Sequence, residues 1–336
     1  MPLVFGLLFV LMAGILQGSF YLPGTYTKKW EWEHTWTFFS LFAMIIFTWI
    51  FIRATVPEIG TIYAEAPAKN IWMLALFGGL WGVGAICTGL AMDRLGMALA
   101  FPIIMGNVAV LGALIPLLTS EPARLFTLQG MILIVGLIVV IAGIVTCSQA
   151  YAYRNPAGSS SGPRKGSFAV NLSIAIAAGV MSSLLNIGFA YGNTLKEAAM
   201  DLGVPQIFAA NTPWPIILTA GGVVNLLYCF YLMFKRGTFK GFFVPEGGRN
   251  SLLGISMGLI WCGGMYLYGP GAAKMGQYGV IVGWVLVMTI NVLVGNLLGI
   301  FRGEWDGAPP RSRSTMNRGL VMLIVAIIIV AISNNI

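Results

Sequence analysis

The residues best suited to chemistry are uncharged polar side chains placed inside long apolar runs. Two pairs share one spacing, since Gln17 and Tyr21 lie four residues apart, as do Ser182 and Asn186. Residues four apart share one face of a helix, and a polar side chain in lipid normally faces the bundle interior or a wet cavity. The pattern predicts a neutral, hydrogen-bonding chamber. The candidate binding residues are Gln17, Tyr21, Trp81, Asn107, Ser182, Asn186, Asn211, Trp261, Tyr266, Gln277 and Tyr278.

These side chains also have a purely structural interpretation. An asparagine in a membrane helix can join two helices by a hydrogen bond, typically worth about 0.6 kcal/mol. That role suits Asn225, Asn291 and Asn296, which lie deep in apolar runs. Tryptophan near the end of a span is commonly an interfacial anchor, so Trp81 and Trp261 fit either an anchor or the flat aromatic wall of a site.

Ionisable side chains border the apolar runs rather than interrupting them. A transported proton normally binds a carboxylate or a histidine, and the nearest such groups are Glu33, His34 and Asp93. We take these three as candidates for proton coupling. Each has an alternative role, because an acid in the first turn of a helix complements the helix dipole and Asp93 beside Arg94 can be a solvated pair in a short loop.

The sequence predicts no catalytic residue, no metal site and no cofactor. It holds one histidine and four cysteines, at positions 87, 147, 229 and 262, without a C-x-x-C pair, so a metal or disulfide framework is not indicated. A membrane enzyme needs a nucleophile with a base, a carboxylate pair or a metal cluster. None is present in the sequence, and the cysteines are predicted to be small packing residues.

The elements that position the candidate residues must be membrane helices. Hydrophobic residues make up 58% of the 336 residues and charged residues only 9%, whereas about a quarter of the residues of a soluble domain are charged. The formal net charge is +8, but the basic residues fall in short intervals between apolar runs and form no nucleic-acid-binding motif. Membrane lipid is therefore the predicted surrounding, nucleic acid is not a predicted partner, and the composition indicates no oligomeric state.

Ten apolar runs predict an all-α polytopic membrane protein with ten transmembrane helices. A hydrocarbon core about 30 Å thick needs about 20 mostly apolar helical residues to cross it. Lys28 and Lys29 follow the first run instead of preceding it, so that run is predicted to be retained and not cleaved as a signal peptide. The predicted spans are 3–25, 36–54, 71–91, 96–118, 128–147, 168–190, 207–234, 251–270, 276–300 and 317–333.

Basic residues predict the orientation of these spans. Short cytoplasmic loops carry the excess of Lys and Arg, and fourteen of the nineteen basic residues follow odd-numbered spans, against five after even-numbered spans. Both termini are therefore predicted to face away from the cytoplasm. A Gly- and Ser-rich stretch lies between spans five and six, so residues 151–166 are predicted to be a cytoplasmic linker between two five-helix repeats, 1–150 and 167–336.

The two halves carry related sequences at an offset of 180 residues. WGVGAICTGLAMDRLG begins at Trp81 and WCGGMYLYGPGAAKMG begins at Trp261, and their ungapped alignment places Arg94 opposite Lys274. Homologous halves with five spans each would be inverted relative to one another, as in secondary transporters. The hairpins at Arg94 and Lys274 are then predicted to be the inner and outer gates of one cavity. The alternative is a chance match between glycine-rich membrane helices.

Six stretches in collinear order resemble the bacterial L-rhamnose–proton symporter family of the drug/metabolite transporter superfamily. They are KKWEWEHTW (28–36), LWGVGAICTGLAMDRLGMALA (80–100), LKEAAMDLGV (195–204), GGVVNLLYCF (221–230), GQYGVIVGW (276–284) and GEWDGAP (303–309). The resemblance implies a bacterial inner (cytoplasmic) membrane protein with periplasmic termini, and import of L-rhamnose or a related 6-deoxyhexose by proton symport. The sequence departs from the family at Gly279, where family members carry an acidic residue.

A monosaccharide suits the types of the candidate residues. Its hydroxyls need amide, hydroxyl and indole partners, its less polar face needs a flat aromatic wall, and it requires no formal charge. Two other transport functions are also compatible with the sequence, namely export of drugs or metabolites by the same superfamily fold, and sugar permeation without proton coupling. A membrane enzyme is the remaining class, and the sequence lacks the residues that such an enzyme needs.

Overall fold

A computed structural model describes residues 2–95, 97–154 and 167–334, and all regular secondary structure within these ranges is helical. Ten segments of the described chain are long and apolar enough to cross a membrane, which confirms the predicted fold class. The spanning helices are α1 (Pro2–Ser19), α2 (Trp32–Ser40) continued by η2 (Leu41–Ile46) and α3 (Phe47–Thr55), α5 (Ala68–Leu95), α6 (Met97–Ser120), α7 (Leu128–Arg154), α8 (Phe168–Tyr191), α11 (Trp214–Arg236), α12 (Gly247–Lys274), α13 (Gly279–Phe301) and α14 (Pro310–Ser333).

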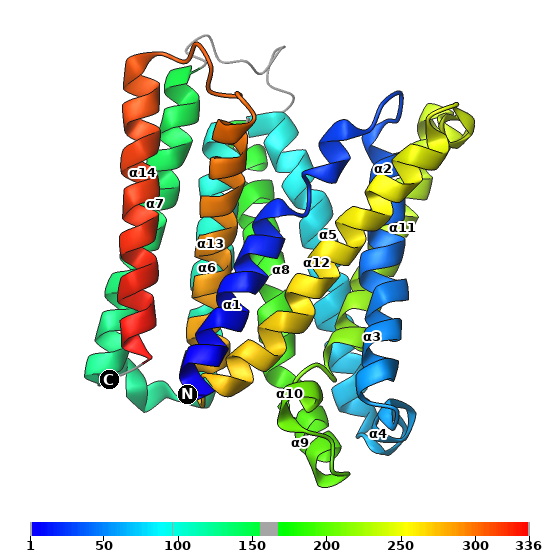
Figure 1. The fold of residues 1–336 in the computed structure, drawn as a ribbon, viewed down its shortest axis with the longest axis vertical. Helices are drawn as coiled ribbons and strands as arrows, with labels where there is room; N and C mark the ends of the chain where they lie inside the picture. The colour runs from blue at the N-terminus through cyan, green and yellow to red at the C-terminus, as the bar shows by residue number, and fades with distance from the viewer. Residues whose placement is uncertain (1, 96, 155–166, 335–336) are drawn as a thin grey trace.

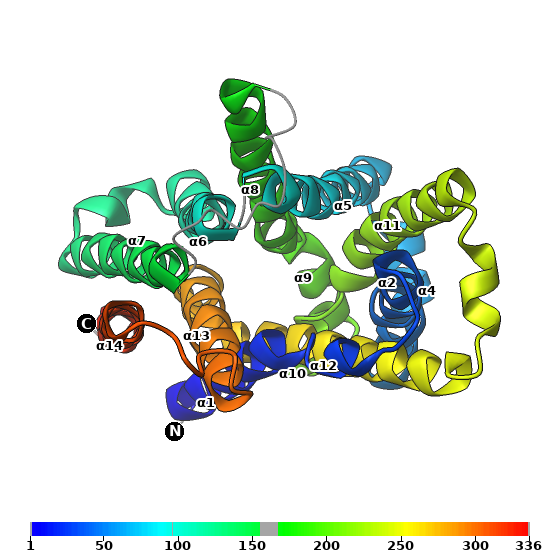
Figure 2. The ribbon, with the colours of Figure 1, turned by 90° about the horizontal axis from the view of Figure 1, so that it is seen from above.

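The spanning helices surround a central axis, and α7 pairs with α14 at one edge (Figure 2). The most extensive contacts join helices from the two halves of the sequence. Helix α5 packs on α8 and α11, α1 packs on α12 and α13, and α6 packs on α8. The two halves are therefore interleaved across the bundle.

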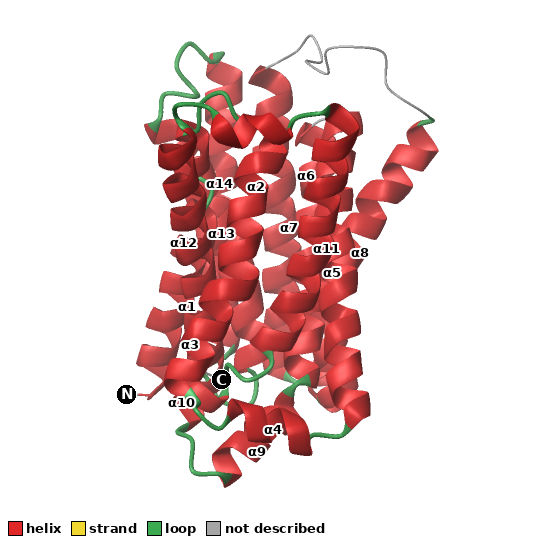
Figure 3. Cartoon of the chain, turned by 90° about the vertical axis from the view of Figure 1, so that its right-hand side faces the viewer, coloured by secondary structure: helices red, strands yellow, loops and turns green. Residues whose placement is uncertain are grey.

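The connections alternate between the two ends of the bundle. Helix α1 begins and α14 ends at the lower end of Figure 1, together with the short helices α4 (Ile59–Glu65), α9 (Asn193–Asp201) and α10 (Gln206–Ala209). Figure 3 shows α4, α9 and α10 at the same end. The opposite end, where α5, α7 and α11 end, is called the upper end, and it carries η1 (Pro23–Tyr26) and η4 (Phe239–Phe243).

Glycines allow α5 to approach its neighbours closely. A Cβ on Gly82 would lie 2.8 Å from the carbonyl oxygen of Gly221 on α11, and a Cβ on Gly84 would lie 2.8 Å from the backbone nitrogen of Ser182 on α8. Membrane helices associate through close van der Waals packing of this kind. The contacts hold α5 against α11 and α8, and Trp81 directly precedes Gly82 on the same helix.

Two predicted spans, 3–25 and 207–234, match the candidate spans Leu3–Tyr26 and Gln206–Arg236, but neither is one continuous α-helix, and prolines explain why. Helix α1 ends at Ser19, and Pro23 begins the 3-10 turn η1. Within the second span, α11 starts at Trp214, directly after Pro213. Proline lacks the backbone N–H that a continuing helix uses and fits the first turn of a new one.

Other helices extend past their predicted apolar limits. Helix α7 continues to Arg154, so the predicted linker 151–166 begins within a helix, and residues 155–166 of that linker lie outside the described residues. Helix α14 begins at Pro310, seven residues before the predicted start. Hydropathy marks the hydrocarbon-crossing part of a helix, whereas backbone hydrogen bonds continue into the polar interface.

Candidate functional site

A cavity of about 450 Å³ lies at the lower end of the bundle, within the size range of small-molecule sites. Residues of six helices and their connections line it, and the two charged ones are Glu121 and Lys196. The lining residues are Pro116, Ser120, Glu121, Phe189, Ala190, Gly192, Asn193, Lys196, Gln206, Ala210, Pro213, Gly269, Ala272, Ala273, Gly276, Gln277, Val280 and Ile281. Its rim is made by lower-end connections, so the cavity faces that end.

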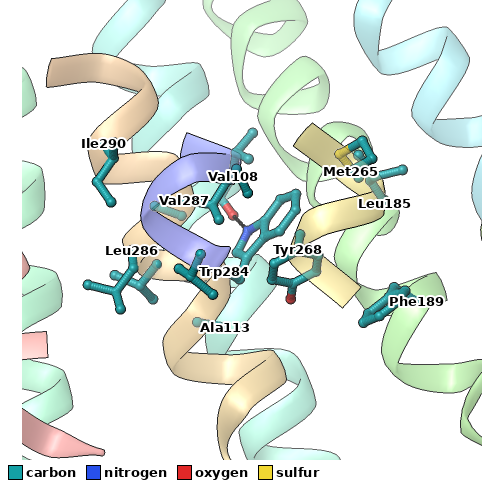
Figure 4. Packing of buried hydrophobic residues seen from close by; sticks show 14 of the residues in the cluster. Val108, Ala113, Leu185, Phe189, Met265, Tyr268, Trp284, Leu286, Val287 and Ile290 are labelled. Carbon is teal, nitrogen blue, oxygen red and sulfur yellow. Dashed lines mark hydrogen bonds between the residues drawn. The ribbon is translucent and has the colours of Figure 1, made fainter. Parts of the chain in front are cut away.

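An aromatic layer packs against the cavity wall, and we define it as Phe189, Trp214, Tyr268 and Trp284. The rings of Phe189 and Trp214 are stacked with centroids 4.3 Å apart, and Tyr268 lies 5.2 Å from Phe189. The ring of Trp284 meets Tyr268 edge to face at 5.8 Å (Figure 4). All four side chains are buried, so the layer closes the inner side of the cavity.

Hydrogen bonds across four helices hold this layer. The Tyr268 hydroxyl lies 2.6 Å from Asn186 Oδ1 and 2.9 Å from the Val280 carbonyl oxygen. Asn186 Nδ2 donates to the Gly112 carbonyl at 2.8 Å, and Trp284 Nε1 donates to the Val108 carbonyl at 3.0 Å (Figure 4). The predicted site residue Asn186 therefore joins α8 to α6 and α12 directly behind the cavity.

The segment before α11 forms one side of the cavity and is held from outside. The Tyr63 hydroxyl donates to the Thr212 carbonyl at 2.6 Å, and burial raises the pKa of Tyr63 well above its ordinary value, so the donor proton is retained. Asn211 Nδ2 donates to the Tyr266 carbonyl at 3.1 Å, and the Tyr266 hydroxyl donates to the Thr48 carbonyl at 2.7 Å. The structure thus brings the predicted residues Asn211 and Tyr266 together.

Trp81 and Trp261, paired by the sequence repeat, stack on one another. Their ring centroids lie 5.8 Å apart with an interplanar angle of 16°, and Phe39 meets Trp261 edge to face. Gln17 Nε2 donates to the Trp261 carbonyl at 3.0 Å. Both tryptophans are buried, so they are internal residues of the bundle and not interfacial anchors.

At the upper end, Glu33 and His34 form a buried network with the connection after α11. Glu33 is fully buried, and its carboxylate accepts from Arg236 Nη1 and from Thr238 Oγ1, both at 3.0 Å. His34 Nδ1 accepts from the Glu31 backbone N–H at 3.1 Å, and Nε2 lies 2.8 Å from the Thr238 carbonyl. These partners assign the neutral tautomer with its proton on Nε2.

Gln277 and Tyr278 lie at the lower rim beside two charged residues that the sequence analysis did not select. Arg124 Nη2 donates to Gln277 Oε1 at 3.0 Å, and its guanidinium lies over the Tyr278 ring. Gln277 Nε2 donates to Glu121, whose carboxylate lies 3.5 Å from Arg124 Nε. This rim cluster joins the connection after α6 to the connection after α12.

The remaining predicted residues lie apart from these groups. Tyr21 is 43% exposed beyond the end of α1, so it does not share a helical face with Gln17. Asn107 Nδ2 bonds within α6 to the Ile103 carbonyl, and Ser182 lies at the contact of α8 with α5. A final set marks the helix ends, with Asp93 exposed and Arg94 half-buried at the upper end of α5, and Lys274 half-buried at the lower end of α12.

Sequence reasoning missed Trp214, Trp284, Glu121 and Arg124. Trp214 carried one usable signal, because a bulky aromatic between Pro213 and Pro215 begins a helix and is therefore fixed in direction. Glu121 and Arg124 carried none, because their role depends on which connections meet at the rim. Within the described residues, no group of three or more His, Cys, Asp or Glu side chains is arranged to hold a metal.

Comparisons with known proteins agree over the whole chain. The family model described as L-rhamnose-proton symport protein matches residues 2–335. An L-rhamnose-proton symporter of Cronobacter sakazakii is 28% identical over 97% of this chain and 96% of the relative. Proteins of the same name from Escherichia coli O1:K1 / APEC and Yersinia pestis are each 27% identical, over 97% and 98% of both chains respectively. The ten apolar helices and this full-length match show that the chain belongs to the L-rhamnose-proton symport protein family, a family of multi-pass bacterial membrane transporters and not of enzymes.

Proposed function

We propose that the protein imports L-rhamnose or a related 6-deoxyhexose together with protons, by alternating access to a site inside the bundle. The observation that carries the proposal is the contrast between a cavity at the lower end and a buried, hydrogen-bonded network at the upper end, within a chain of this family. A transporter that alternates between two access states has one end open while the other is closed. Family membership does not favour the drug or metabolite exporter.

The lower end is proposed to face the periplasm, in the inner membrane. Of the seventeen basic residues that the structure describes, twelve belong to connections or helix ends at the upper end and five to the lower end, as the positive-inside tendency requires of a cytoplasmic face. In this orientation the cavity is open outward and both termini are periplasmic. Sugar would enter the cavity from the outside.

The two halves are proposed to be inverted repeats. The packing supports this because α5 contacts α8 and α11 as α12 contacts α1 and α2, and because α6 contacts α8 as α13 contacts α1. Trp81 and Trp261 occupy equivalent repeat positions and stack face to face. Arg94 and Lys274 then mark the inner and outer hairpins that exchange roles as access alternates.

The substrate is proposed to bind between the cavity and the stacked tryptophans. Asn186, Asn211 and Gln277 supply amide groups near the cavity, and Gln17 lies beside Trp261. Amide groups can donate to and accept from sugar hydroxyls, and an indole face suits the less polar face of the ring. The stack of Trp81 on Trp261 would have to part for sugar to pass towards the upper end.

Glu33 is proposed to be the proton-coupling carboxylate, with His34 as its neutral neighbour. It is the one fully buried acid among the described residues whose burial is assigned, and buried carboxylates in transporters are characteristic of proton binding. Protonation would weaken the contact with Arg236 and so release α2 from the connection after α11. Asp93 is exposed at the upper end, where its charge is readily solvated.

Uptake by proteoliposomes tests the function. Purified protein should accumulate labelled L-rhamnose when the proton gradient is directed inward, and a protonophore should abolish accumulation. Uptake that continues unchanged after dissipation would contradict symport and leave the uncoupled permease. Labelled sugar that leaves preloaded vesicles but does not enter empty ones would instead favour an exporter.

The Glu33→Gln variant tests the coupling site. We expect it to keep exchange of labelled for unlabelled sugar across the membrane and to lose accumulation, because exchange needs no net proton movement. Glu246→Gln is the matched control, since Glu246 is an acid at the same end with a partly exposed side chain. Full accumulation by Glu33→Gln, with loss in Glu121→Gln, would move coupling to the lower rim.

A further inference from the structure

Two buried polar atoms lack a hydrogen-bond partner at one place in the cavity wall. They are Asn211 Oδ1 and Trp214 Nε1, and neither has a partner among the residues that the structure describes. Asn211 is 3% exposed and Trp214 is fully buried. Buried polar groups are nearly always paired, since an unpaired one loses its bonds to water without replacement. Two such atoms only three residues apart therefore require an explanation.

The backbone around these atoms is tightly held, so local mobility does not explain them. Thr212 Oγ1 donates to the Ala209 carbonyl at 2.9 Å, and Tyr63 holds the Thr212 carbonyl from outside the segment. The backbone nitrogen of Trp214 donates to the Asn211 carbonyl at 3.1 Å. The two unpaired atoms belong to a fixed turn whose own backbone groups are satisfied.

Both side chains lie directly behind residues that line the cavity. Ala210 and Pro213, their chain neighbours, are lining residues. Asn211 Oδ1 occupies the space where a side chain at Gly269 would begin, so glycine in the wall leaves the amide oxygen behind backbone only. Phe189, which also lines the cavity, covers Trp214 with its ring 4.3 Å away.

The chemistry of the two atoms is complementary to a hydroxyl group. Asn211 Oδ1 is an acceptor and Trp214 Nε1 is a donor, while a hydroxyl both donates one hydrogen bond and accepts others. Neither Lys196 nor Glu121, the charged residues of the cavity, is hydrogen-bonded to either atom. The two atoms therefore favour a neutral polyhydroxyl ligand over an ion.

We propose that Asn211 and Trp214 form a hydroxyl-binding subsite for the transported monosaccharide, an inference that rests on the function proposed above. The sugar reaches the subsite when the Phe189 ring turns away from Trp214, which opens the aromatic layer towards the cavity. The Trp214 indole then donates to one sugar hydroxyl and Asn211 Oδ1 accepts from the same or a neighbouring hydroxyl. Binding supplies the partners that both atoms lack in the sugar-free protein.

Trp214→Phe is the sharpest test because it removes the unpaired N–H and keeps an aromatic ring. Titration calorimetry of purified protein should show L-rhamnose binding weakened about tenfold, the effect of one hydrogen bond. The thermal unfolding midpoint of the sugar-free protein should fall no further than in the control variant Trp49→Phe, because both variants lose indole volume but only Trp214→Phe removes a buried N–H that has no partner. A residue with a merely structural role would lower that midpoint and leave the sugar affinity unchanged.

Trp49→Phe is the matched control, since Trp49 Nε1 already donates to Thr219 Oγ1 at 3.0 Å. We expect it to lower the unfolding midpoint and to leave sugar affinity within about twofold. Asn211→Leu is the second variant, and it should weaken sugar binding more than Trp214→Phe does. Because Asn211→Leu also loses the hydrogen bond to Tyr266, it is compared with Asn296→Leu on α13, which likewise loses an amide bond to a backbone carbonyl. Unchanged affinity in both subsite variants would overturn the subsite.

Sugars lacking single hydroxyls identify the group that binds. In the wild type, one monodeoxy derivative of L-rhamnose should bind about tenfold more weakly than L-rhamnose. In Trp214→Phe, the same derivative and L-rhamnose should bind with equal affinity, because the effects of removing two groups that contact one another are non-additive. Additive losses for every hydroxyl would contradict the contact. Absence of binding of any monosaccharide to the wild type would refute the proposed function and the subsite together. Normal binding of L-rhamnose by the wild type, with unchanged affinity in both subsite variants, would refute the subsite alone.

Discussion

The two ends of the bundle differ in how side chains join neighbouring segments of the chain. At the upper end, Arg236 and Thr238 reach from the connection after α11 to Glu33 on α2. Asn250 at the start of α12 exchanges two hydrogen bonds with the backbone of Lys28. At the lower end, the charged rim cluster joins the connections after α6 and α12, and the cavity lies beside it.

This difference indicates that connections, and not the spanning helices, decide which end is closed. Helix pairs such as α5 with α8 and α1 with α12 make extensive contacts of their own within the bundle. The contacts unique to the closed end involve residues outside or at the limits of the apolar spans. Breaking them should therefore open the upper end without dismantling the bundle.

The largest effect is expected for Arg236→Ala. It leaves the fully buried Glu33 carboxylate without its cationic partner, and loss of a hydrogen bond to a charged group costs about 2 kcal/mol. The unfolding midpoint should fall, and the native thiol of Cys229, buried on α11, should react with maleimide from the upper end. The measurement uses protein in which the other three cysteines are replaced by alanine.

The double variant Glu33→Gln/Arg236→Ala controls that experiment. Removing the carboxylate charge as well should restore most of the lost stability, because no unpaired charge stays buried. If Arg236→Ala leaves both the midpoint and Cys229 reactivity unchanged, the upper-end network does not hold that end closed.

Gly279→Ala should give the next largest effect, at the lower end. A Cβ at this position would collide with the Ala272 carbonyl oxygen, so the α12–α13 connection at the cavity rim must move. Overpacking of this kind costs roughly 1–3 kcal/mol, and sugar binding should weaken because the rim is displaced. Gly248→Ala, with open space around its Cβ, is the control, and equal stability of the two variants would contradict the close packing.

The spanning helices could be predicted from sequence because each must be about 20 apolar residues long. The lower-end helices α4 and α9 could not, since they are short and lie between the apolar runs. The pairing of Trp81 with Trp261 was accessible through the repeat, although their direct stacking was not. Whether two repeat positions meet at the axis depends on how the helices pack.

The candidate site was predicted in part, and local helix geometry explains the failures. Gln17 and Tyr21 were expected to share a helical face, but α1 ends between them at Ser19. Asn186 and Asn211 were selected as polar residues within spans, and the structure places both behind the cavity wall. Trp214 and Glu121 gain their positions from contacts between segments far apart in sequence, which periodicity does not encode.

The stack of Trp81 on Trp261 should contribute a smaller effect, midway between the ends. An aromatic pair contributes roughly 0.5–1.5 kcal/mol beyond its buried area, so a double-mutant cycle with leucine at both positions should show coupling of about 1 kcal/mol. Added L-rhamnose should reduce this coupling if the sugar parts the rings. Zero coupling in the sugar-free protein would mean that the stack does not join the two halves.

The smallest expected effect belongs to a partly exposed ion pair at the upper end, Lys29 and Glu246. Lys29 Nζ lies 2.8 Å from Glu246 Oε1, and the hydrogen bond from Lys29 holds the pKa of the Glu246 carboxyl below its ordinary value of 4.5. A carboxyl whose pKa is lower in the folded protein stabilises the fold above its unfolded pKa, and that contribution is lost as pH falls through the folded value. The midpoint difference between wild type and Glu246→Gln should therefore be constant at neutral pH and disappear below the ordinary carboxyl range. Because the side chains are partly solvated, the difference should be small and should shrink further in high salt. A difference that persists in acid would show that the Glu246 side chain stabilises the start of α12 without its charge. Of the two ion pairs that the described residues form at the upper end, only that of Glu33 with Arg236 would then contribute electrostatic stabilisation.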